Sequence, residues 1–462
     1  MKRLGISVSL ILAILILAFS VLSVFGYSYY VGDNKSTVFK GFGSIDWGID
    51  VNGGSKIAVK TATPDEISAV ADVVRERAVS FGLTDCQINV DTAEGQLELT
   101  VPHSIDCDFS ASEVASFLTS YGALTIRPGS SYANMSVDTS NSAAFITPTG
   151  TTAETVLISS DDVMGSSWFE YTEEGNTYYY LNINFNEVGS EKMATYTNAD
   201  TGTYYNQQIS IWLDDRMISN PTVGETIDQG ALSVSSDSMT ESKCKLYSAV
   251  ISSGTLPCAV TYVSVSEVAP ITSSTSDIIF ITGLIALIVI LAFMVIRYKL
   301  GAFAGFFAVL LQLSAVLAVI TGFVGEGRTF LLTIPGACAL ALSVMLTVFS
   351  FALIGERMKS ELLTGTVVGT AINTGIEKSR KVILDTSVVL ALVALIGMFM
   401  FGTSSLTTSI FGAFTVGGVY NFSYVLFFGS IFNLVTGYLV PQLMLRSLQS
   451  LTKKPSAFGG AK

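Results

Sequence analysis

The sequence is poor in the side chains that most enzymes and metal sites need. It has 462 residues with one histidine, His103, and five cysteines, and it contains no Cys-x-x-Cys pair. Metal sites and acid–base catalysis use clusters of such groups, and no metal set or nucleophile–base pair stands out here. A histidine base would have to be His103 alone. The sequence therefore predicts a protein that is not an enzyme and that needs no cofactor or metal.

Charge is scarce as well. Only 13% of the residues are charged and 50% are hydrophobic, whereas about 25% charged residues are usual in soluble domains. The stretch 329–355 has no charged residue at all. A helix needs about 20 apolar residues to cross the hydrocarbon core, and its backbone must be hydrogen-bonded within the segment. These observations exclude an ordinary soluble domain and predict a membrane helix.

Apolar runs of this kind recur along the chain. They lie at 6–25, 278–296, 301–323, 330–354, 383–401 and within 410–445. We therefore expect an α-helical membrane bundle of about six transmembrane helices. The first run follows Lys2-Arg3 and is longer than the roughly 7–15-residue core of a signal peptide. We interpret residues 1–26 as an anchor with a cytoplasmic N-terminus, and a signal peptide is the alternative.

The charged residues are distributed unevenly. Thirteen Lys/Arg and 4 Asp/Glu fall in the short segments expected in the cytoplasm, 1–3, 297–300, 356–385 and 446–462. Segment 27–277 has 11 Lys/Arg and 32 Asp/Glu, a net −21. Basic short loops stay in the cytoplasm, whereas a long domain is translocated largely regardless of its charge. We expect 27–277 to be extracytoplasmic, 278–446 to form five helices in the cytoplasmic membrane, and 447–462 to be a cytoplasmic tail. An acidic domain also disfavours a nucleic-acid partner.

The external segment begins with an α+β pattern. Its elements are a strand, a helix, two strands, a helix and a strand, at 49–59, 63–78, 87–90, 96–101, 110–121 and 123–127. Thr63–Glu66 and Ser110–Glu113 are capping-box sequences at the two helix starts, and Gly122 is placed to cap the end of the second helix. The order βαββαβ predicts a ferredoxin-like unit.

A second α+β pattern follows. Strands are expected at 178–185, 209–213, 231–234 and 259–265, with helices at 188–197 and 238–254. The last helix begins at a third capping box, Ser238–Glu241, and ends at Gly254. We therefore predict a large extracytoplasmic α+β domain of tandem ferredoxin-like units. The Ser/Thr/Gly-rich interval 129–176 is either a flexible linker or a small inserted subdomain.

Four of the five cysteines lie in the external segment, where disulfides can persist. They are Cys86, Cys107, Cys244 and Cys258. A hairpin that starts at Cys86 would bring Cys107 back beside it, and Cys244–Cys258 would be the remaining pair. Thiols are the alternative at all four positions. Cys338 falls in a membrane helix and is most simply a small apolar residue.

Short motifs along the external segment are similar, in the same order, to those of SecD, a subunit of the bacterial SecDF protein translocase accessory complex. The stretches are 48–54 (GLDLxGG in the family), 74–83 (RNRVxxLG), 211–221 (ivlDgkvisaP) and 254–257 (GaLP). The matching residues include Asp50, Gly53, Gly54, Asp214, Pro221 and Pro257. Any one motif is weak, but the shared order continues into the predicted membrane helices.

In those helices, Glu356-Arg357 matches the family's FERIxEE, and 383–388, with Asp385, resembles ilDaNvt. The resemblance implies a subunit of the RND superfamily that pairs with a SecF-type subunit beside the SecYEG translocon. Such a subunit is expected to assist the export of emerging polypeptides and to draw on the proton gradient. The resemblance also implies that 129–176 corresponds to the family's head subdomain in a reduced form.

One departure from the family matters for proton transfer. The family has an aspartate and an asparagine seven and five residues before the glutamate of FERI, inside the membrane. Those places are Phe349 and Phe351 here, with Ser350 between them. Ionisable groups inside a membrane are costly and are normally kept for ion transfer. Because a phenyl ring binds no proton, we expect that this subunit does not carry protons by the family's route.

Asp385 is the remaining candidate for a proton relay. It falls at the cytoplasmic start of the helix expected at 383–401, beside Lys381. Carboxylates favour helix N-termini, so an exposed cap is the alternative interpretation. Proton flux in Asp385→Asn distinguishes the two.

The acidic external face also allows two interpretations. It is either a solvated surface or a surface that keeps an emerging chain soluble through edge strands and exposed apolar patches. Two other functions compete with a SecD-like role: a small RND-like exporter, which would want charges inside the membrane, and a membrane-anchored scaffold without transport activity.

Overall fold

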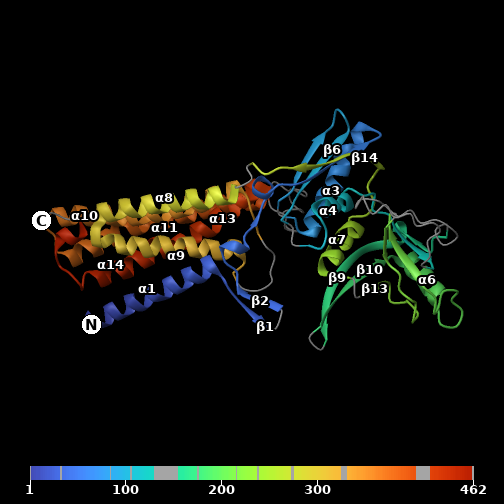
Figure 1. Ribbon diagram of the computed structural model, residues 1–462, viewed down its shortest axis with the longest axis horizontal. Helices are drawn as coiled ribbons and strands as arrows, with labels where there is room; N and C mark the ends of the chain where they lie inside the picture. The colour runs from blue at the N-terminus through green and yellow to red at the C-terminus, as the bar shows by residue number, and fades with distance from the viewer. Residues whose placement is uncertain are drawn as a thin grey trace. The chain divides into compact units, whose positions relative to one another are not determined.

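A computed structural model describes residues 2–31, 34–83, 85–104, 107–129, 155–173, 176–214, 216–236, 239–271, 275–323, 330–401 and 417–459. The chain forms two compact units (Figure 1). The helical unit contains Met1–Asn52, Ala269–Gly402 and Val416–Lys462, and the sheet unit contains Gly53–Val268. Each unit is described separately below.

Long apolar helices build the helical unit. They are α1 (Lys2–Phe25), α8 (Thr275–Tyr298), α9 (Ala302–Thr321), α10 (Ile334–Leu363), α11 (Val368–Phe401), α13 (Gly417–Asn433) and α14 (Val440–Leu448). In the part of the chain that the structure describes, four stretches are long and apolar enough to cross a membrane: Thr275–Thr321, Ile334–Leu363, Val368–Phe401 and Gly417–Leu448. The first is interrupted by the 3-10 turn η4 (Lys299–Gly301), where Lys299 has a φ of 50°. The predicted membrane helical region is confirmed.

Two helices are longer than the sequence pattern predicts. α10 continues past residue 354 to Leu363, and α11 begins at Val368 instead of 383. The extra turns are amphipathic and carry charges, so a search for apolar runs misses them. Lys378 of α11 and Glu361 of α10 form a 2.7 Å ion pair between these added turns.

The last helical stretch changes its winding partway. α13 passes into a π-helical turn, η5 (Leu434–Leu439), which continues into α14. The predicted span within 410–445 corresponds to these elements from residue 417 on, and 402–416 lies outside the described residues. The helical unit also contains short elements: β1 (Tyr27–Val31), β2 (Asn34–Phe39), η1 (Phe42–Ser44), β3 (Asp46–Trp47), α2 (Ile49–Asn52), β15 (Leu331–Leu332) and the C-terminal η6 (Pro455–Phe458).

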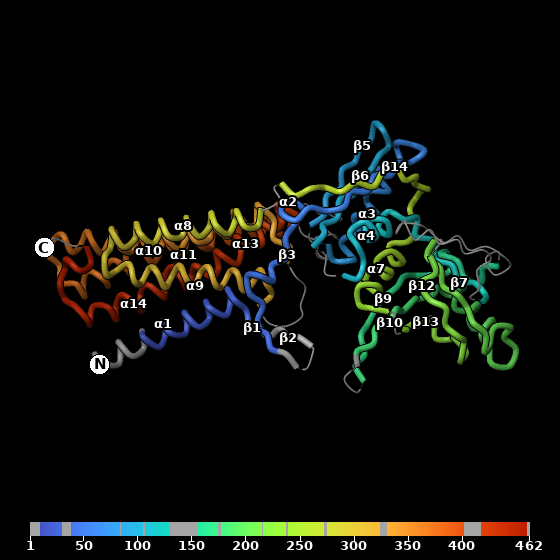
Figure 2. The backbone as a smooth tube through the Cα atoms, viewed as in Figure 1, coloured from blue at the N-terminus to red at the C-terminus, as the bar shows by residue number. Residues whose placement is uncertain are grey.

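The first sheet of the sheet unit has the strand order β14-β4-β6-β5, and all its neighbours are antiparallel. Its elements are β4 (Gly54–Thr61), η2 (Pro64–Glu66), α3 (Ile67–Phe81), β5 (Gln87–Asp91), β6 (Gln96–Pro102), α4 (Ala111–Leu118) and β14 (Val260–Val268). Figure 2 shows β4 and β14 side by side although they lie far apart in the sequence. The expectation that 123–127 closes this sheet is therefore wrong, because β14 takes that edge.

The strand expected at 123–127 forms, as β7 (Leu124–Pro128), but it belongs to a second sheet of order β12-β11-β7-β8. The other strands are β8 (Ile158–Ser159), β11 (Ile209–Leu213) and β12 (Arg216–Ser219). β7 pairs with β11 over five residues. Leu124 and Ile126 enter the core beside Ile211 and Leu213, so each strand supplies a buried side to the same layer.

A third sheet, of order β13-β10-β9, contains β9 (Val163–Glu173), β10 (Asn176–Phe185) and β13 (Ala231–Val234). The helices η3 (Ser160–Asp162), α6 (Glu187–Thr197) and α7 (Glu241–Ser252) complete the unit. β9 pairs with β10 along its whole length. Of the interval 129–176, the described residues 155–173 thus form strands and a turn instead of a flexible linker.

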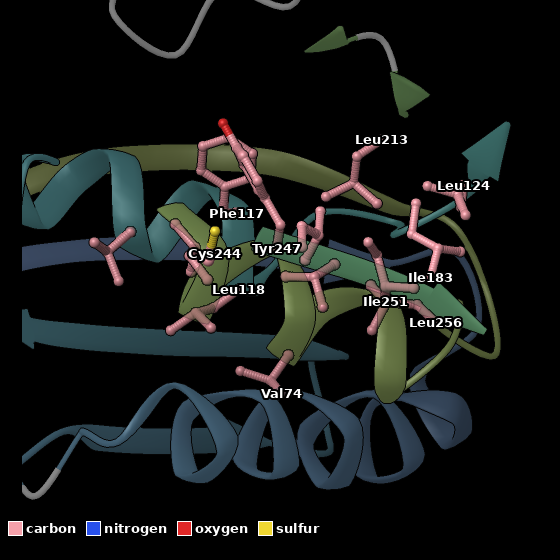
Figure 3. Packing of buried hydrophobic residues seen from close by; sticks show 14 of the residues in the cluster. Val74, Phe117, Leu118, Leu124, Ile183, Leu213, Cys244, Tyr247, Ile251 and Leu256 are labelled. Atoms are coloured by element: carbon pink, nitrogen blue, oxygen red, sulfur yellow. The ribbon is translucent and has the colours of Figure 1, made fainter. Parts of the chain in front are cut away.

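One hydrophobic core joins the two predicted halves of the sheet unit. It contains residues of α3, α4 and α7 together with strands of all three sheets. Figure 3 shows part of it: Val74, Phe117, Leu118, Leu124, Ile183, Leu213, Cys244, Tyr247, Ile251 and Leu256. A shared core explains why strand partners are exchanged between the halves.

The predicted helix caps are partly confirmed. Ser110 and Glu113 form the capping box of α4. At the start of α3 the chain makes the 3-10 turn η2, and the Thr63 side chain accepts no capping hydrogen bond. α7 is capped by Thr240, whereas Ser238 lies outside the described residues. Residues 49–52, predicted as strand, form α2.

Candidate functional site

Six polar side chains lie buried in the middle of the apolar helical unit. They are Gln312 of α9, Thr347 and Ser350 of α10, Ser387 of α11, Asn433 of α13 and Thr436 of η5, and none is more than 1% exposed. We call them the polar network. Burying polar groups among apolar side chains is costly unless they are hydrogen-bonded, and in membranes such bonds join helices. Their partners therefore show what the site can do.

Asn433 is the centre of the polar network. Its Nδ2 donates to Ser350 Oγ at 3.0 Å and to Ser387 Oγ at 2.9 Å. Its Oδ1 accepts from Thr347 Oγ1 at 2.9 Å. One amide side chain thus connects α10, α11 and α13.

Thr436 extends the network to α9. Its Oγ1 donates to Gln312 Oε1 at 2.6 Å, and Gln312 Nε2 donates to the carbonyl of Gly429 at 2.8 Å. Thr436 lies in the π-helical turn η5, three residues after Asn433. Such turns often occur at functional sites because they shift the register of the side chains that follow.

All groups of the polar network are neutral amides and hydroxyls, and none of them titrates near neutral pH. They can orient one another, but they cannot store a proton. Phe349, at the family's aspartate position, is 53% exposed, and Phe351 is buried with its ring centroid 5.3 Å from that of Tyr298. Of the three neighbouring residues, Ser350 is the one that joins the network.

Asp385 lies outside the polar network. It is exposed and is in the middle of α11, because that helix begins at Val368. The expectation that it caps a helix start is therefore wrong. Ser387, two residues later and on another side of the same helix, is the α11 residue that reaches Asn433.

Asp50 holds the start of α10. Its Oδ2 accepts the backbone N–H of Ile334, the first residue of α10, at 2.6 Å. A carboxylate at a helix N-terminus is stabilised by the helix dipole. Burial raises the pKa of Asp50, and the hydrogen bond from Ile334 N–H opposes this increase. The motif glycines follow, with Gly53 at a φ of 76° and Gly54 packed against the Val101 carbonyl.

The motif glutamate joins α8 to α10. Arg297 donates to Glu356 through Nε at 2.7 Å and Nη2 at 2.8 Å, and Tyr298 Oη donates to Glu356 at 3.0 Å. Arg357 is half-buried beside it. These contacts hold α8 against α10. The polar network is therefore our candidate site in the helical unit.

The sheet unit buries a full charge. Arg77 of α3 is 0% exposed, and its Nε donates to Ser253 Oγ at 2.8 Å. Its remaining donors bind backbone carbonyls at the C-terminal ends of α4 and α7 or just after them: Leu118 (3.1 Å), Ser120 (2.6 Å), Tyr121 (3.2 Å) and Gly254 (2.7 Å). Carbonyls at helix C-termini carry partial negative charge. Burial lowers the pKa of Arg77 to about 10, with Asp214 opposing it, so Arg77 stays charged at neutral pH.

The motif aspartate stabilises the same junction. Asp214 accepts the N–H groups of Gly122 and Ala123, each at 2.8 Å. A Cβ on Gly122 would lie 2.3 Å from Arg77 Nη2, so this glycine makes room for the guanidinium. The predicted role of Gly122 as the cap of α4 is wrong, since Thr119 occupies that position.

The other motif residues of the sheet unit have backbone or surface roles. The Pro221 carbonyl accepts the N–H of Ile209, and Pro257 is exposed. Sequence analysis did not single out Arg77. The sequence does contain a sign of its burial. Arg77 falls three residues after Val74, so a charged residue lies on the apolar stripe of α3.

Among the described residues no two cysteines form a disulfide, so the structure has the thiol alternative. Cys86 and Cys244 are buried in the shared core. Cys107 Sγ donates to the Phe109 carbonyl at 3.2 Å. Burial raises the pKa of Cys244 to about 11. Burial, with the nearby Glu66, raises the pKa of Cys258.

Comparison with known proteins gives consistent matches. The model of the SecDF P1 head subdomain matches residues 145–258. The protein translocase subunit SecD of Acidaminococcus fermentans is 27% identical over 282 residues, 60% of this chain and 62% of that protein. SecD of Calditerrivibrio nitroreducens is 30% identical over 48% of this chain and 41% of that protein. The chain thus spans less than two thirds of these relatives. SecD of Petrotoga mobilis is 23% identical over 91% of this chain and 90% of its own length.

Solved structures show the same fold. The crystal structure of SecDF in its super-membrane-facing form has 17% sequence identity and a TM-score of 0.56, covering 98% of this chain and 58% of that chain. SecDF from Thermus thermophilus, described as a translocon-associated membrane protein, has 17% identity and a TM-score of 0.51, covering 97% and 59%.

Apolar membrane helices joined to a large sheet-containing unit of this kind define a membrane protein of the SecDF fold. Within that class, the head-subdomain match and the curated relatives show that the chain is similar to SecD subunits.

Proposed function

We propose that this chain assists the translocation of polypeptides across the cytoplasmic membrane as a SecD-like subunit and that it carries no protons through its own helices. The single observation behind the second part is the neutral polar network centred on Asn433. The similarity to SecD subunits supports the first part. We take its role to be accessory and not catalytic.

The proposed topology has six transmembrane spans: α1, α8, α9, α10, α11 and the α13–α14 stretch. α8 and α9 count separately because Lys299 interrupts their 47-residue stretch. The sheet unit is extracytoplasmic, since segment 53–268 has 9 Lys/Arg and 28 Asp/Glu and the basic residues gather near the helix ends. Its first sheet is a ferredoxin-like unit, because β14-β4-β6-β5 has that fold's antiparallel order, with a distant fourth strand.

The proposed partners are a SecF-type subunit, the SecYEG translocon and emerging polypeptides. Support comes from the solved relatives, one of which is described as SecDF and translocon-associated. Where SecD supplies no titratable group inside the membrane, proton coupling has to come from the partner subunit.

Affinity purification of the full chain from its native membranes tests the partners. SecF-type and SecYEG subunits are expected to copurify, and recovery of a lone homo-oligomer contradicts the proposal. Proton flux is then measured in vesicles that contain the purified complex. Asn433→Leu is expected to leave flux per folded complex unchanged, whereas abolished flux in a complex that remains assembled shows that protons do pass through this network.

A membrane-anchored scaffold without transport work is the second candidate, and the same neutral network favours it. Export rates in cells that lack the chain distinguish the two functions. A SecD-like subunit predicts slower export that the full chain restores, whereas a scaffold predicts unchanged export.

A further inference from the structure

A cavity in the sheet unit is lined by residues of β7 and β14. Its volume is about 430 Å³, which is within the roughly 300–1,000 Å³ of small-molecule sites. β7 contributes Thr125 and Arg127, β14 contributes Val260 and Tyr262, and the loop after α4 contributes Tyr121. β7 belongs to the second sheet and β14 to the first. A ligand in this cavity therefore contacts both sheets.

The alternation of β7 gives the cavity its polar wall. Leu124 and Ile126 lie in the core and are at most 1% exposed, whereas Thr125 and Arg127 lie on the other side of the strand and line the cavity. Arg127 Nε donates to Thr125 Oγ1 at 3.1 Å, so the neighbouring threonine orients the guanidinium. The cavity thus has a cation that the strand holds in a defined place.

An apolar and aromatic surface completes the wall. Tyr121 is 44% exposed and Tyr262 is 37% exposed, and both line the cavity together with Ala259 and Val260. Tyr262 Oη donates to the Ser116 carbonyl at 3.1 Å, which fixes the position of its ring. Such a wall gives contact area to the apolar part of a ligand, because aromatic rings bury large surfaces.

The carboxylate that lines the cavity is already compensated within the protein. Each oxygen of Asp214 accepts a backbone N–H at 2.8 Å, one from Gly122 and the other from Ala123, and Arg216 lies near the same carboxylate. The sheet unit as a whole has a net charge of −19, from 9 Lys/Arg and 28 Asp/Glu. General electrostatics would therefore repel an anion, and only a local cation such as Arg127 can attract one here.

We infer that this cavity binds a small organic anion. Its carboxylate or phosphate group binds to Arg127, and its apolar body contacts Tyr121 and Tyr262. Arginine suits this role, because its planar guanidinium binds the oxygens of either group through two parallel hydrogen bonds. The inference goes beyond the proposed function and does not depend on it. By contacting both β7 and β14, the anion stabilises the sheet unit.

The test uses the full chain in lipid nanodiscs, with empty nanodiscs as the blank for partitioning into lipid. Calorimetric titration compares three probes that share a phenyl ring: phenylacetate, phenyl phosphate and the neutral phenylacetamide. At least one of the two anions is expected to bind, and phenylacetamide is expected to bind about tenfold more weakly than that anion. The tighter of the two anions identifies the charged group. Equal affinity for phenylacetamide, or no binding of either anion, overturns the inference.

Arg127→Gln removes the positive charge from the cavity and is expected to weaken binding of the tighter anion about tenfold. Arg75→Gln is the matched control. Arg75 pairs with Asp72 on α3 and lies outside the residues that line the cavity, so its replacement is expected to change the affinity less than about twofold. Equal losses in the two variants show that general surface charge attracts the anion, and they overturn the inference.

Ala259→Phe gives a second test that leaves every charge in place and does not depend on the folding of Arg127→Gln. Ala259 is exposed, and a ring at this position occupies the cavity, so the tighter anion is expected to bind about tenfold more weakly. The anion is also expected to slow amide hydrogen exchange of the unmodified chain at 123–127 and 259–262. Unchanged affinity in Ala259→Phe, or unchanged exchange at both segments, overturns the inference and leaves the proposed function intact.

Discussion

The helical unit and the sheet unit both bury polar groups, but they do so with opposite chemistry. In the helical unit the groups are neutral, and Asn433 bonds to other side chains. In the sheet unit Arg77 keeps its full charge, and backbone carbonyls accept four of its five hydrogen bonds. A charge is costly in an apolar interior unless dipoles surround it. Loops that follow helix ends expose such carbonyls, whereas the carbonyls inside a membrane helix are already hydrogen-bonded along the helix. The surroundings of Arg77 therefore suit a full charge better than the surroundings of Asn433 do.

Removing the buried charge of the sheet unit is expected to have the largest effect on stability. Arg77→Met removes the guanidinium that donates to the carbonyls of Leu118, Ser120 and Gly254. The free energy of unfolding of the sheet unit is expected to fall by about 3–5 kcal/mol. Guanidinium unfolding of the full chain in detergent, followed by the fluorescence of Trp168 and Trp212, measures this loss.

Arg75→Met is the control for that experiment. Arg75 lies two residues earlier in α3 and pairs with the exposed Asp72 at 2.7 Å. A surface pair of this kind contributes about 0–1 kcal/mol. If both variants lose the same stability, the carbonyl cluster is not what holds Arg77.

Removing the centre of the polar network tests the helical unit. Asn433→Leu leaves Thr347, Ser350 and Ser387 without their shared partner. Hydrogen bonds between membrane helices contribute about 0.6 kcal/mol each on average, so three of them predict a loss of about 2 kcal/mol. Thermal unfolding of the full chain in detergent, followed by circular dichroism, measures it.

Ser430→Ala is the matched control in the same helix. Ser430 is fully buried, and its Oγ has no hydrogen-bond partner within the described parts of the chain. Its removal is expected to leave stability unchanged or slightly higher, because a buried unsatisfied hydroxyl is lost. A larger loss in Ser430→Ala than in Asn433→Leu would show that volume and not hydrogen bonding determines the result.

The pH dependence of stability tests a second buried charge of the sheet unit, Asp162. Asp162 is buried and accepts hydrogen bonds from Lys192 Nζ at 2.7 Å and from Ser159 N–H at 3.0 Å. Burial acts to raise the pKa of Asp162, but these hydrogen bonds outweigh it, and the pKa is lowered from its usual value near 3.8. The stabilisation is therefore present above about pH 4 and is lost as the pH falls through the lowered folded value.

Asp162→Asn is accordingly expected to reduce stability by about 1–2 kcal/mol at pH 7. The difference from the unmodified chain should shrink as the pH falls below 4. Denaturant midpoints at pH 7 and pH 3 measure this, and Asp161→Asn, at the exposed neighbour, is the control. A difference that stays constant with pH contradicts the role assigned to the carboxylate.

The smallest effect is expected at Asp385. Its side chain is exposed on α11 and outside the polar network. Asp385→Asn is expected to change stability by less than about 0.5 kcal/mol and to leave proton flux of the purified complex unchanged. Reduced flux with normal assembly would restore the relay hypothesis.

Local sequence patterns predicted where the strands lie, but they did not predict which strands pair with one another. The strands expected at 209–213 and 231–234 have those bounds as β11 and β13, since alternation and turn residues act within a few positions. The partner of β4 could not be found in this way. β14 begins at residue 260, whereas β4 ends at residue 61, and β14 resembles any other half-apolar strand.

The same holds for the functional residues: the sequence identifies some of them but not their contacts. Motifs pointed to Asp214, but its two hydrogen-bonded N–H groups come from residues 122 and 123, and that contact depends on the tertiary fold. The polar network left a weak local signal. Thr347 and Ser350, like Asn433 and Thr436, are three residues apart and so lie on one helix face. Which of these faces meet depends on helix packing, which a single sequence does not specify.

The late position of β14 has a consequence for biosynthesis. Gly54 and Val268 are register partners, so the first sheet cannot be completed until 214 further residues have left the ribosome. At elongation rates of about 5–20 residues per second this takes roughly 10–40 s. During that interval β4 is a nascent strand with one unprotected edge, and such an edge is a template for pairing with another strand.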